Sequence, residues 1–224
     1  MPNNMYSEIR WDSTGERFFE MGVKKGVLYP INHEGNYNDG VAWNGLTSVA
    51  ETPDGAEATD LYADDIKYAS FRSAEKFGGT IEAYMFPDEW YECDGSAELA
   101  PGVYLGQQTR KKFGMSYVTQ IGNDVQGEGL GYKLHLVYGA TASPSERTYE
   151  SINDSPDAIT FSWDFETTPV DVQGYKPTSL ITINSLKADP TKLKALETIL
   201  YGSSSQAPRL PMPDEVYTLM KSDS

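Results

Sequence analysis

From residue 113 the sequence reads Phe113-Gly-Met-Ser-Tyr-Val-Thr119, then Tyr132-Lys-Leu-His-Leu-Val-Tyr138, then Ile159-Thr-Phe-Ser-Trp-Asp-Phe-Glu166. Large apolar and polar residues alternate in all three segments. Successive side chains of a strand point to opposite faces, so this alternation predicts a half-buried antiparallel sheet. Turn residues at 122–127 and 153–156 separate the three segments. The region between Thr109 and Thr168 therefore predicts a mainly β fold.

Shorter strands are expected on both sides of this region. The pattern predicts them over 17–29, 46–51, 66–72, 80–86 and 180–185. A turn at Phe77-Gly-Gly79 should join the third of these to the fourth, and Pro87–Cys93 should form a helical turn. Gly, Asn, Asp and Pro recur between Ile31 and Asp64 and predict a long loop, interrupted only by the strand at 46–51. Loops of this length in a compact domain are usually functional or disordered.

One convincing helix is predicted over 189–201. Asp189 is suited to cap its N-terminus, Pro190 to its first position and Gly202 to its end. Its apolar face should contain Leu193, Leu196, Ile199 and Leu200. Beyond a Ser/Pro-rich stretch, a short terminal helix is expected over 214–221, with inward-facing Val216, Leu219 and Met220.

The charge balance excludes several classes of function. The 224 residues include 33 acidic and 18 basic ones, for a net charge of -15. Such a chain is a poor ligand for nucleic acid or an anionic membrane, since it cannot neutralise phosphates. A single cysteine excludes an intrachain disulfide. No signal segment and no apolar stretch of ~18 residues occur, so we expect folding in a cytoplasm.

Reactive residue patterns are also missing. No Gly-x-Ser-x-Gly motif accompanies the two histidines, so His135 is expected to be a structural residue of a strand and His33 a surface loop residue. Cys93 is expected to be a packed apolar residue. The glycines at 127–131 predict a turn rather than a dinucleotide loop. The acidic groups at 60–65 and 124–128 do not fit a calcium loop. The sequence predicts no catalytic residue, metal or cofactor, and hence no enzyme.

Two other classes remain open. A carbohydrate-binding β-sandwich, such as a phage receptor-binding or decoration module, could use Tyr37, Trp43 or Trp90 as stacking platforms. A glycosidase is the weakest alternative; it could pair carboxylates near aromatic residues, with Glu82, Glu89 and Glu92 beside Trp90. The match to a glycosylation sequon at 153–155 favours a turn, because no secretory signal accompanies it.

Several segments together carry a family resemblance. They are Ala63–Tyr84, Glu92–Gly95, Gly106–Arg110, Tyr132–Gly139, Ser143–Arg147, Ile152–Pro156 and Leu200–Gly202. Over roughly Arg10 to Val216 the chain resembles the major tail protein of long-tailed, non-contractile phages of Gram-positive bacteria. None of the segments is a catalytic signature.

The resemblance implies one tail tube domain over 1–224: an antiparallel β-sandwich or barrel-like core, a flanking helix, an N-terminal arm over 1–16 and a C-terminal tail over 203–224. The 31–64 loop would stack rings through Tyr37, Trp43 and Leu61. Six copies would form each ring, and stacked rings would surround a tape measure protein. Other implied partners are tail terminator and distal tail proteins, with double-stranded DNA passing through without specific binding. The location would be the virion, assembled in the host cytoplasm and without a membrane partner.

An acidic lumen suits this reading, because a basic one would hold DNA by releasing counterions. Strand 159–166 best combines an apolar face with a polar one, through Ser162, Asp164 and Glu166. Glu82 is a second lumen candidate. The alternative, that these side chains face outer solvent, stays open from the sequence.

Overall fold

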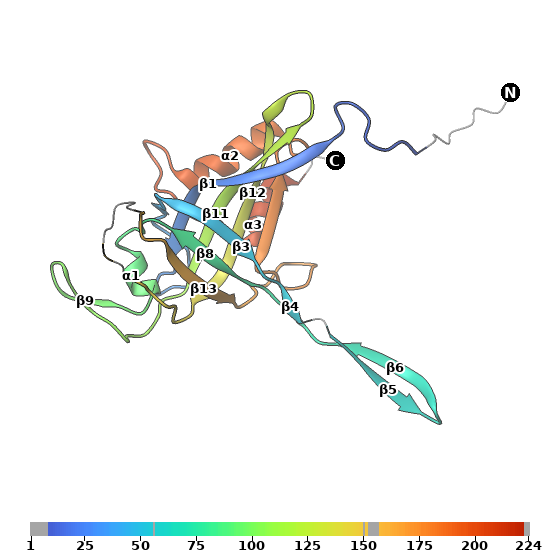
Figure 1. Ribbon diagram of the computed structural model, residues 1–224, viewed down its shortest axis with the longest axis horizontal. Coiled ribbons are helices and arrows are strands. Elements are labelled where there is room, and N and C mark those ends of the chain that lie inside the picture. Colours follow the sequence, from blue (N-terminus) through green and yellow to red (C-terminus); the bar gives the residue numbers. More distant parts are fainter. Residues whose placement is uncertain (1–8, 56, 150, 152–156, 222–224) are drawn as a thin grey trace.

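The computed structural model describes residues 9–55, 57–149, 151 and 157–221. These residues form antiparallel sheets with three helices, so the predicted mainly β class is confirmed (Figure 1). The 153–155 sequon and the first eight residues of the predicted arm lie outside the described residues.

The largest sheet has the strand order β2-β1-β11-β12-β13-β8-β3, and β14 pairs with β12 beside this path. The strands are β1 Phe18–Pro30, β2 Val41–Ala42, β3 Leu46–Glu51, β8 Gly78–Ala83, β11 Phe113–Asn123, β12 Gly127–Ala142, β13 Phe161–Thr167 and β14 Leu180–Asn184. The three long strands of the opening pattern are therefore present, at β11, β12 and β13, but the prediction that they are half-buried is wrong for most of β11 and for the second half of β12, which are covered on both faces. The turn predicted at 122–127 joins β11 to β12, where Asn123 lies opposite Gly127.

Strand β12 changes partner at Gly139. Residues Lys133–Val137 pair with β14, whereas Ala140–Ala142 pair with β13. Gly139 has φ +63°, and a Cβ there would lie 2.1 Å from the carbonyl oxygen of Thr168. Only glycine fits this conformation and this close approach. The bend directs β13, β8 and β3 over one face of the long strands.

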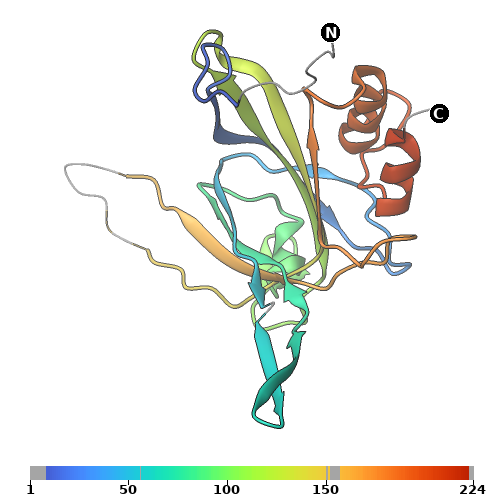
Figure 2. The same ribbon diagram turned by 90° about the vertical axis from the view of Figure 1, so that its right-hand side faces the viewer.

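Two cores lie on opposite faces of β11 and β12. The first lies beneath β13, β8, β3 and the short helix α1, Trp90–Cys93, and contains Trp43, Trp90 and Trp163. The rings of Trp43 and Trp163 pack against Trp90 with centroids 4.7 and 5.4 Å away. The second core is covered by α2, Pro190–Tyr201, and α3, Pro213–Met220 (Figure 2). The result is a layered, sandwich-like body flanked by helices.

Helix α2 forms as the sequence predicts. The Asp189 carboxylate accepts hydrogen bonds from the backbone N–H groups of Thr191 and Lys192, at 2.8 and 3.0 Å. These bonds satisfy donors that a helix start otherwise leaves free, and they lower the pKa of Asp189 despite some desolvation. The predicted terminal helix is also present as α3, beginning at Pro213.

The predicted loop over 31–64 is wrong as a single loop. Besides β3, which is the predicted strand at 46–51, it contains β2, β4 (Asp54–Gly55) and β5 (Ala58–Ala63). Strand β5 pairs with β6, Ile66–Arg72, and β4 pairs with β7, Glu75–Lys76. The chain reverses at Asp64 and Asp65, both at positive φ, a conformation that Asp tolerates better than most residues.

The turn predicted at Phe77–Gly79 is wrong as well. Gly78 and Gly79 begin β8, between β13 and β3. A Cβ on Gly79 would lie 2.2 Å from the carbonyl oxygen of Ala50 and 2.8 Å from the Phe165 ring. Glycine is needed here because a backbone and an aromatic ring approach closely, which a local turn signal does not distinguish.

Candidate functional site

A two-stranded ribbon, Asp54–Lys76, projects from the body of the molecule (Figures 1 and 2). One side of the ribbon consists of β4 and β5, and the other of β6 and β7. No described residue of the ribbon is buried. Five large apolar side chains on it are exposed: Leu61, Tyr62, Ile66, Tyr68 and Phe71, with Tyr68 at 76%. A salt bridge of 2.7 Å joins Lys67 to Asp60 across the two strands. The ribbon is thus a paired element with uncovered apolar side chains.

The structure separates the three residues predicted for ring stacking. Leu61 lies on the ribbon, but Tyr37 and Trp43 are each only 3% exposed. The Tyr37 hydroxyl accepts a hydrogen bond from the Gly139 backbone N–H at 2.9 Å, and Trp43 Nε1 donates to the Met85 carbonyl at 3.0 Å. Both side chains belong to the cores, because the turn-rich backbone that bears them packs against the sheets.

The same burial removes the predicted carbohydrate platforms. Trp90 is fully buried in the first core, and Tyr37 and Trp43 are buried as described above, so none of the three can stack on a sugar ring. The carboxylates predicted for a glycosidase do not lie together either. Glu82 lies on β8, apart from the pocket that Glu89 and Glu92 line.

The four predicted lumen residues lie together on one polar face. Ser162 is opposite Glu82 in the β13–β8 ladder, and Asp164 and Glu166 follow two and four pairs along. Asp164 accepts a hydrogen bond of 2.6 Å from the Thr80 hydroxyl. The intervening Trp163 and Phe165 point into the first core, so the predicted alternation holds on β13. The arrangement brings three carboxylates onto adjacent strands, while their place in a lumen stays a prediction.

A polar cluster gathers around His135, on the face of β12 toward the first core. The Tyr117 ring stacks on His135 with centroids 4.7 Å apart. His135 Nδ1 lies 3.2 Å from Glu51 Oε1, and Nε2 lies 3.0 Å from the Thr119 hydroxyl. Glu20 of β1 accepts bonds from Thr119 and Lys133. The cluster therefore joins β1 and β3 to β11 and β12.

Burial and hydrogen bonds together shift the pKa values of this cluster. Desolvation lowers the pKa of His135, although Glu51 and Glu20 act in the opposite direction. Burial alone would raise the pKa of Glu20, but the hydrogen bonds from Lys133 and Thr119 bring it below its usual value. Burial, with the bond to Glu51, raises the pKa of Tyr117. His135 is thus an interior residue, as the sequence predicts, but its carboxylate partners come from distant strands that no local pattern indicates.

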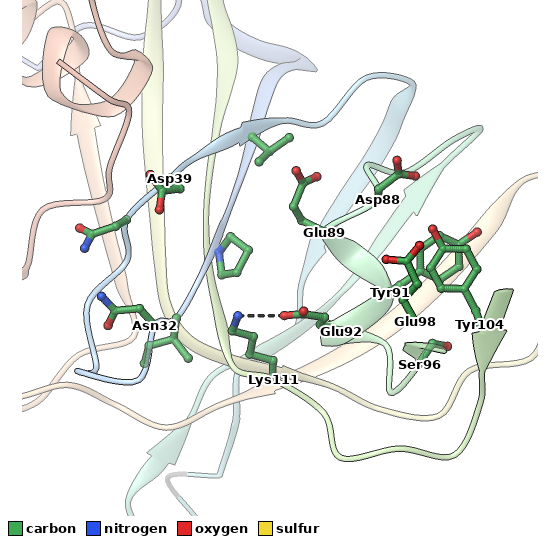
Figure 3. A pocket seen from close by; sticks show the side chains of 14 residues that line it. Asn32, Asp39, Asp88, Glu89, Tyr91, Glu92, Ser96, Glu98, Tyr104 and Lys111 are labelled. Carbon is green, nitrogen blue, oxygen red and sulfur yellow. Dashed lines mark hydrogen bonds and ion pairs between the residues drawn. The ribbon is translucent and has the colours of Figure 1, made fainter. Parts of the chain in front are cut away.

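An open, acidic pocket of about 520 Å³ lies beside α1 (Figure 3). Its walls include Asp88, Glu89 and Glu92, and the last forms a 2.8 Å ion pair with Lys111. Tyr91 and Tyr104 stack with ring centroids 3.8 Å apart, which fixes the β9–β10 hairpin (Ala97–Ala100 and Val103–Leu105) against α1. Within the described ranges, no group of three or more His, Cys, Asp or Glu side chains is arranged to hold a metal ion.

A groove of about 640 Å³ lies along β14, between the 172–178 segment and α3. We call it the edge groove. Its lining is mostly apolar and includes Ile181, Ile183, Val216, Tyr217 and Met220. No local pattern in the sequence indicates this groove, because Val216 and Met220 are expected to pack inward unless the distance between α3 and β14 is known.

Comparisons with known proteins give little further guidance. No family model and no curated protein sequence matches the chain. Among the described residues, no helix is both long and apolar enough to cross a membrane. One similar solved structure is the sheath/tube terminator of an extracellular contractile injection system, PVC, in its extended state. It is 11% identical, covers 79% of this chain and 99% of its own, and superposes with a TM-score of 0.34; at this level the likeness carries no conclusion about function.

Proposed function

We propose that this chain is the self-assembling subunit of a phage tail tube. Six copies form a ring, and rings stack around a tape measure protein into a conduit for double-stranded DNA. In this role the chain is a structural virion protein and not an enzyme, and it meets the tail terminator and distal tail proteins at the ends of the tube. The resemblance over Arg10 to Val216 supports this function.

The ribbon is the observation that carries the proposal. An isolated two-stranded hairpin is marginally stable in water, and apolar side chains exposed together mark an interaction surface. At ~3.3 Å per residue, the chain from Asp54 to Asp64 reaches roughly 35 Å. A protruding element of this length with Tyr62, Ile66, Tyr68 and Phe71 exposed is well suited to contact another ring.

The polar face of β13 and β8 supports the conduit. Six chains of charge -15 give a ring of about -90. With Glu82, Asp164 and Glu166 facing the lumen, DNA phosphates would find no cations to neutralise them and would slide. The same face exposed to outer solvent would serve solubility only.

Electron microscopy of the purified full chain tests the proposal. Negative-stain images should contain rings or tubes with a central channel. In a deletion variant, a Gly-Ser turn joins Pro53 to Phe77 in place of the ribbon. This variant should stay monomeric and should unfold at the same midpoint temperature as the wild-type chain. The matched control shortens the β9–β10 hairpin at Gly102 and should still assemble. A wild-type chain that remains monomeric at high concentration, by sedimentation, contradicts the proposed function.

A further inference from the structure

Strand β14 has a free edge. It pairs with β12 on one side, and no described strand pairs with its other side. An open edge exposes unpaired N–H and C=O groups, which proteins usually cover or protect. Here the edge borders the edge groove, whose apolar lining is also uncovered: Tyr175 and Tyr217 are 68% and 47% exposed. The edge and the groove together form one unpartnered surface.

The charge of this surface is opposite in sign to the net charge of the whole chain. The only charged residues that line the groove are Lys176 and Lys187, and no acidic residue lines it. Both lysines are exposed, and neither forms an ion pair within the described part of the chain. In a protein of net charge -15, a groove whose only charged lining residues are lysines favours an acidic occupant.

The ribbon has the complementary character. Between Asp54 and Lys76 the sequence holds six acidic and three basic residues, and the turn places Asp64 and Asp65 at the tip. Its exposed apolar side chains match the apolar lining of the groove. The N-terminal arm, 1–16, is a weaker match: it holds three acidic residues and one basic residue, and its described part exposes two large apolar side chains, Ile9 and Trp11, against five on the ribbon.

The ribbon points away from α2 and α3, so it does not meet the edge groove of its own chain (Figure 2). We propose that the ribbon of one copy docks in the edge groove of a second copy, with Asp64 and Asp65 near Lys176 and Lys187. This inference rests on the proposed self-assembly and names the acceptor surface for it. The contact is heterologous, since each copy contributes a different surface, and it therefore propagates from copy to copy.

Cross-linking of the full chain tests the docking. The double variant Ala63→Cys with Thr182→Cys places one thiol on the ribbon and one in the groove. Cys93 should not interfere, because it is buried and burial raises the pKa of its thiol to about 12. A short bismaleimide should give a ladder of covalent multimers on a denaturing gel. The matched control pairs Ala63→Cys with Leu99→Cys, an exposed position on β9, and should remain a single band.

A double-mutant cycle that removes the charges on each side provides a second test, measured as the concentration needed for assembly. One variant combines Asp64→Asn with Asp65→Asn. Asparagine also tolerates positive φ, so this variant preserves the turn and removes the negative charge at the tip of the ribbon. This variant, and Lys176→Gln with Lys187→Gln, should each raise the concentration needed for assembly several-fold. The two combined should raise it no further, because the charges act on one another. Lys194→Gln, on the exposed part of α2, is the control and should change nothing.

The outcomes separate the two hypotheses. Tubes without a ladder, or strictly additive charge effects, overturn the docking and leave the tail tube function intact. Absence of both tubes and ladder overturns both. A ladder from Ser13→Cys with Thr182→Cys, and none from the ribbon variant, would assign the groove to the N-terminal arm and so reject the ribbon as its occupant.

Discussion

The Tyr117 hydroxyl donates a 2.5 Å hydrogen bond to Glu51 Oε1, and this bond joins β11 to β3. The two strands are far apart in the order of the sheet, at β11 and at its terminal strand β3. The bond therefore holds the layer formed by β13, β8 and β3 against the long strands β11 and β12. Beneath it, the Tyr117 ring stacks on His135, which contacts the same carboxylate.

Tyr117→Phe should lower the free energy of unfolding by about 1.5–3 kcal/mol, the usual value for a hydrogen bond to a charged group. The ring and its stacking on His135 remain, so only the bond to Glu51 is lost. Urea unfolding at pH 7.5 measures the change. Tyr62→Phe, on the exposed ribbon, is the control and should be neutral; equal stability of the Tyr117 variant would show that the bond does not hold the layers together.

His135 makes stability depend on pH. Its pKa in the folded protein lies below the ordinary 6.5, so the folded state resists protonation that the unfolded state accepts. Stability should be fully present above pH 6.5 and should fall as the pH decreases below it. Denaturant titrations from pH 8 to 5 should show this fall, reduced in His135→Gln.

The exposed His33 supplies the matched control for this titration. His33→Gln should retain the wild-type decline in stability. The lowered pKa of Glu20 adds a further loss, but only below about pH 4.5, as its folded-state partners release it. An unchanged slope between pH 6.5 and 5 in His135→Gln would assign the decline to other groups.

Lysine on the polar face tests the lumen. Glu82→Lys with Glu166→Lys replaces two carboxylates and leaves the Asp164–Thr80 hydrogen bond in place. Tubes should still form, but they should retain double-stranded DNA at low salt and release it as salt rises, because new phosphate contacts release counterions. Fluorescent DNA and electron microscopy would show whether DNA is held inside. Binding on the outer wall, or none, would place the face elsewhere.

Gly139→Ala should be strongly destabilising. The substitution combines a positive φ with a Cβ 2.1 Å from a backbone oxygen, and together these should cost about 2–4 kcal/mol. Gly129→Ala is the matched control, since Gly129 has φ +93° but nothing within 4 Å of its Cβ position. The difference between the two, measured by thermal unfolding, isolates the close approach of β12 and Thr168. Equal losses would contradict it.

Local signals account for what could be predicted from the sequence. Alternation identified β11, β12 and β13, and the capping residues Asp189 and Pro190 fixed α2 almost to the residue. The side chains of Ser162, Asp164 and Glu82 fell on one face as period two requires. These features depend on neighbours one to four residues away.

What escaped prediction depends on distant partners. The ribbon reverses at two aspartates at positive φ, where a hairpin turn more commonly has Asn-Gly. Gly79 looked like a turn residue because nothing nearby reveals the Ala50 backbone packed against it. Tyr37 and Trp43 follow turn-rich sequence, yet their rings fill cores formed by strands that lie far away in the chain. The edge groove likewise exists only once α3 is placed beside β14.

The distribution of tryptophan gives this protein a natural optical probe. Trp43, Trp90 and Trp163 are all in the first core, whereas Trp11 of the N-terminal arm is 79% exposed. Three indoles thus report on whether the body is folded, and the fourth on what happens to the arm. If assembly covers the arm, the emission accessible to a soluble quencher should disappear without any change in the buried signal, and no external label is needed to follow it.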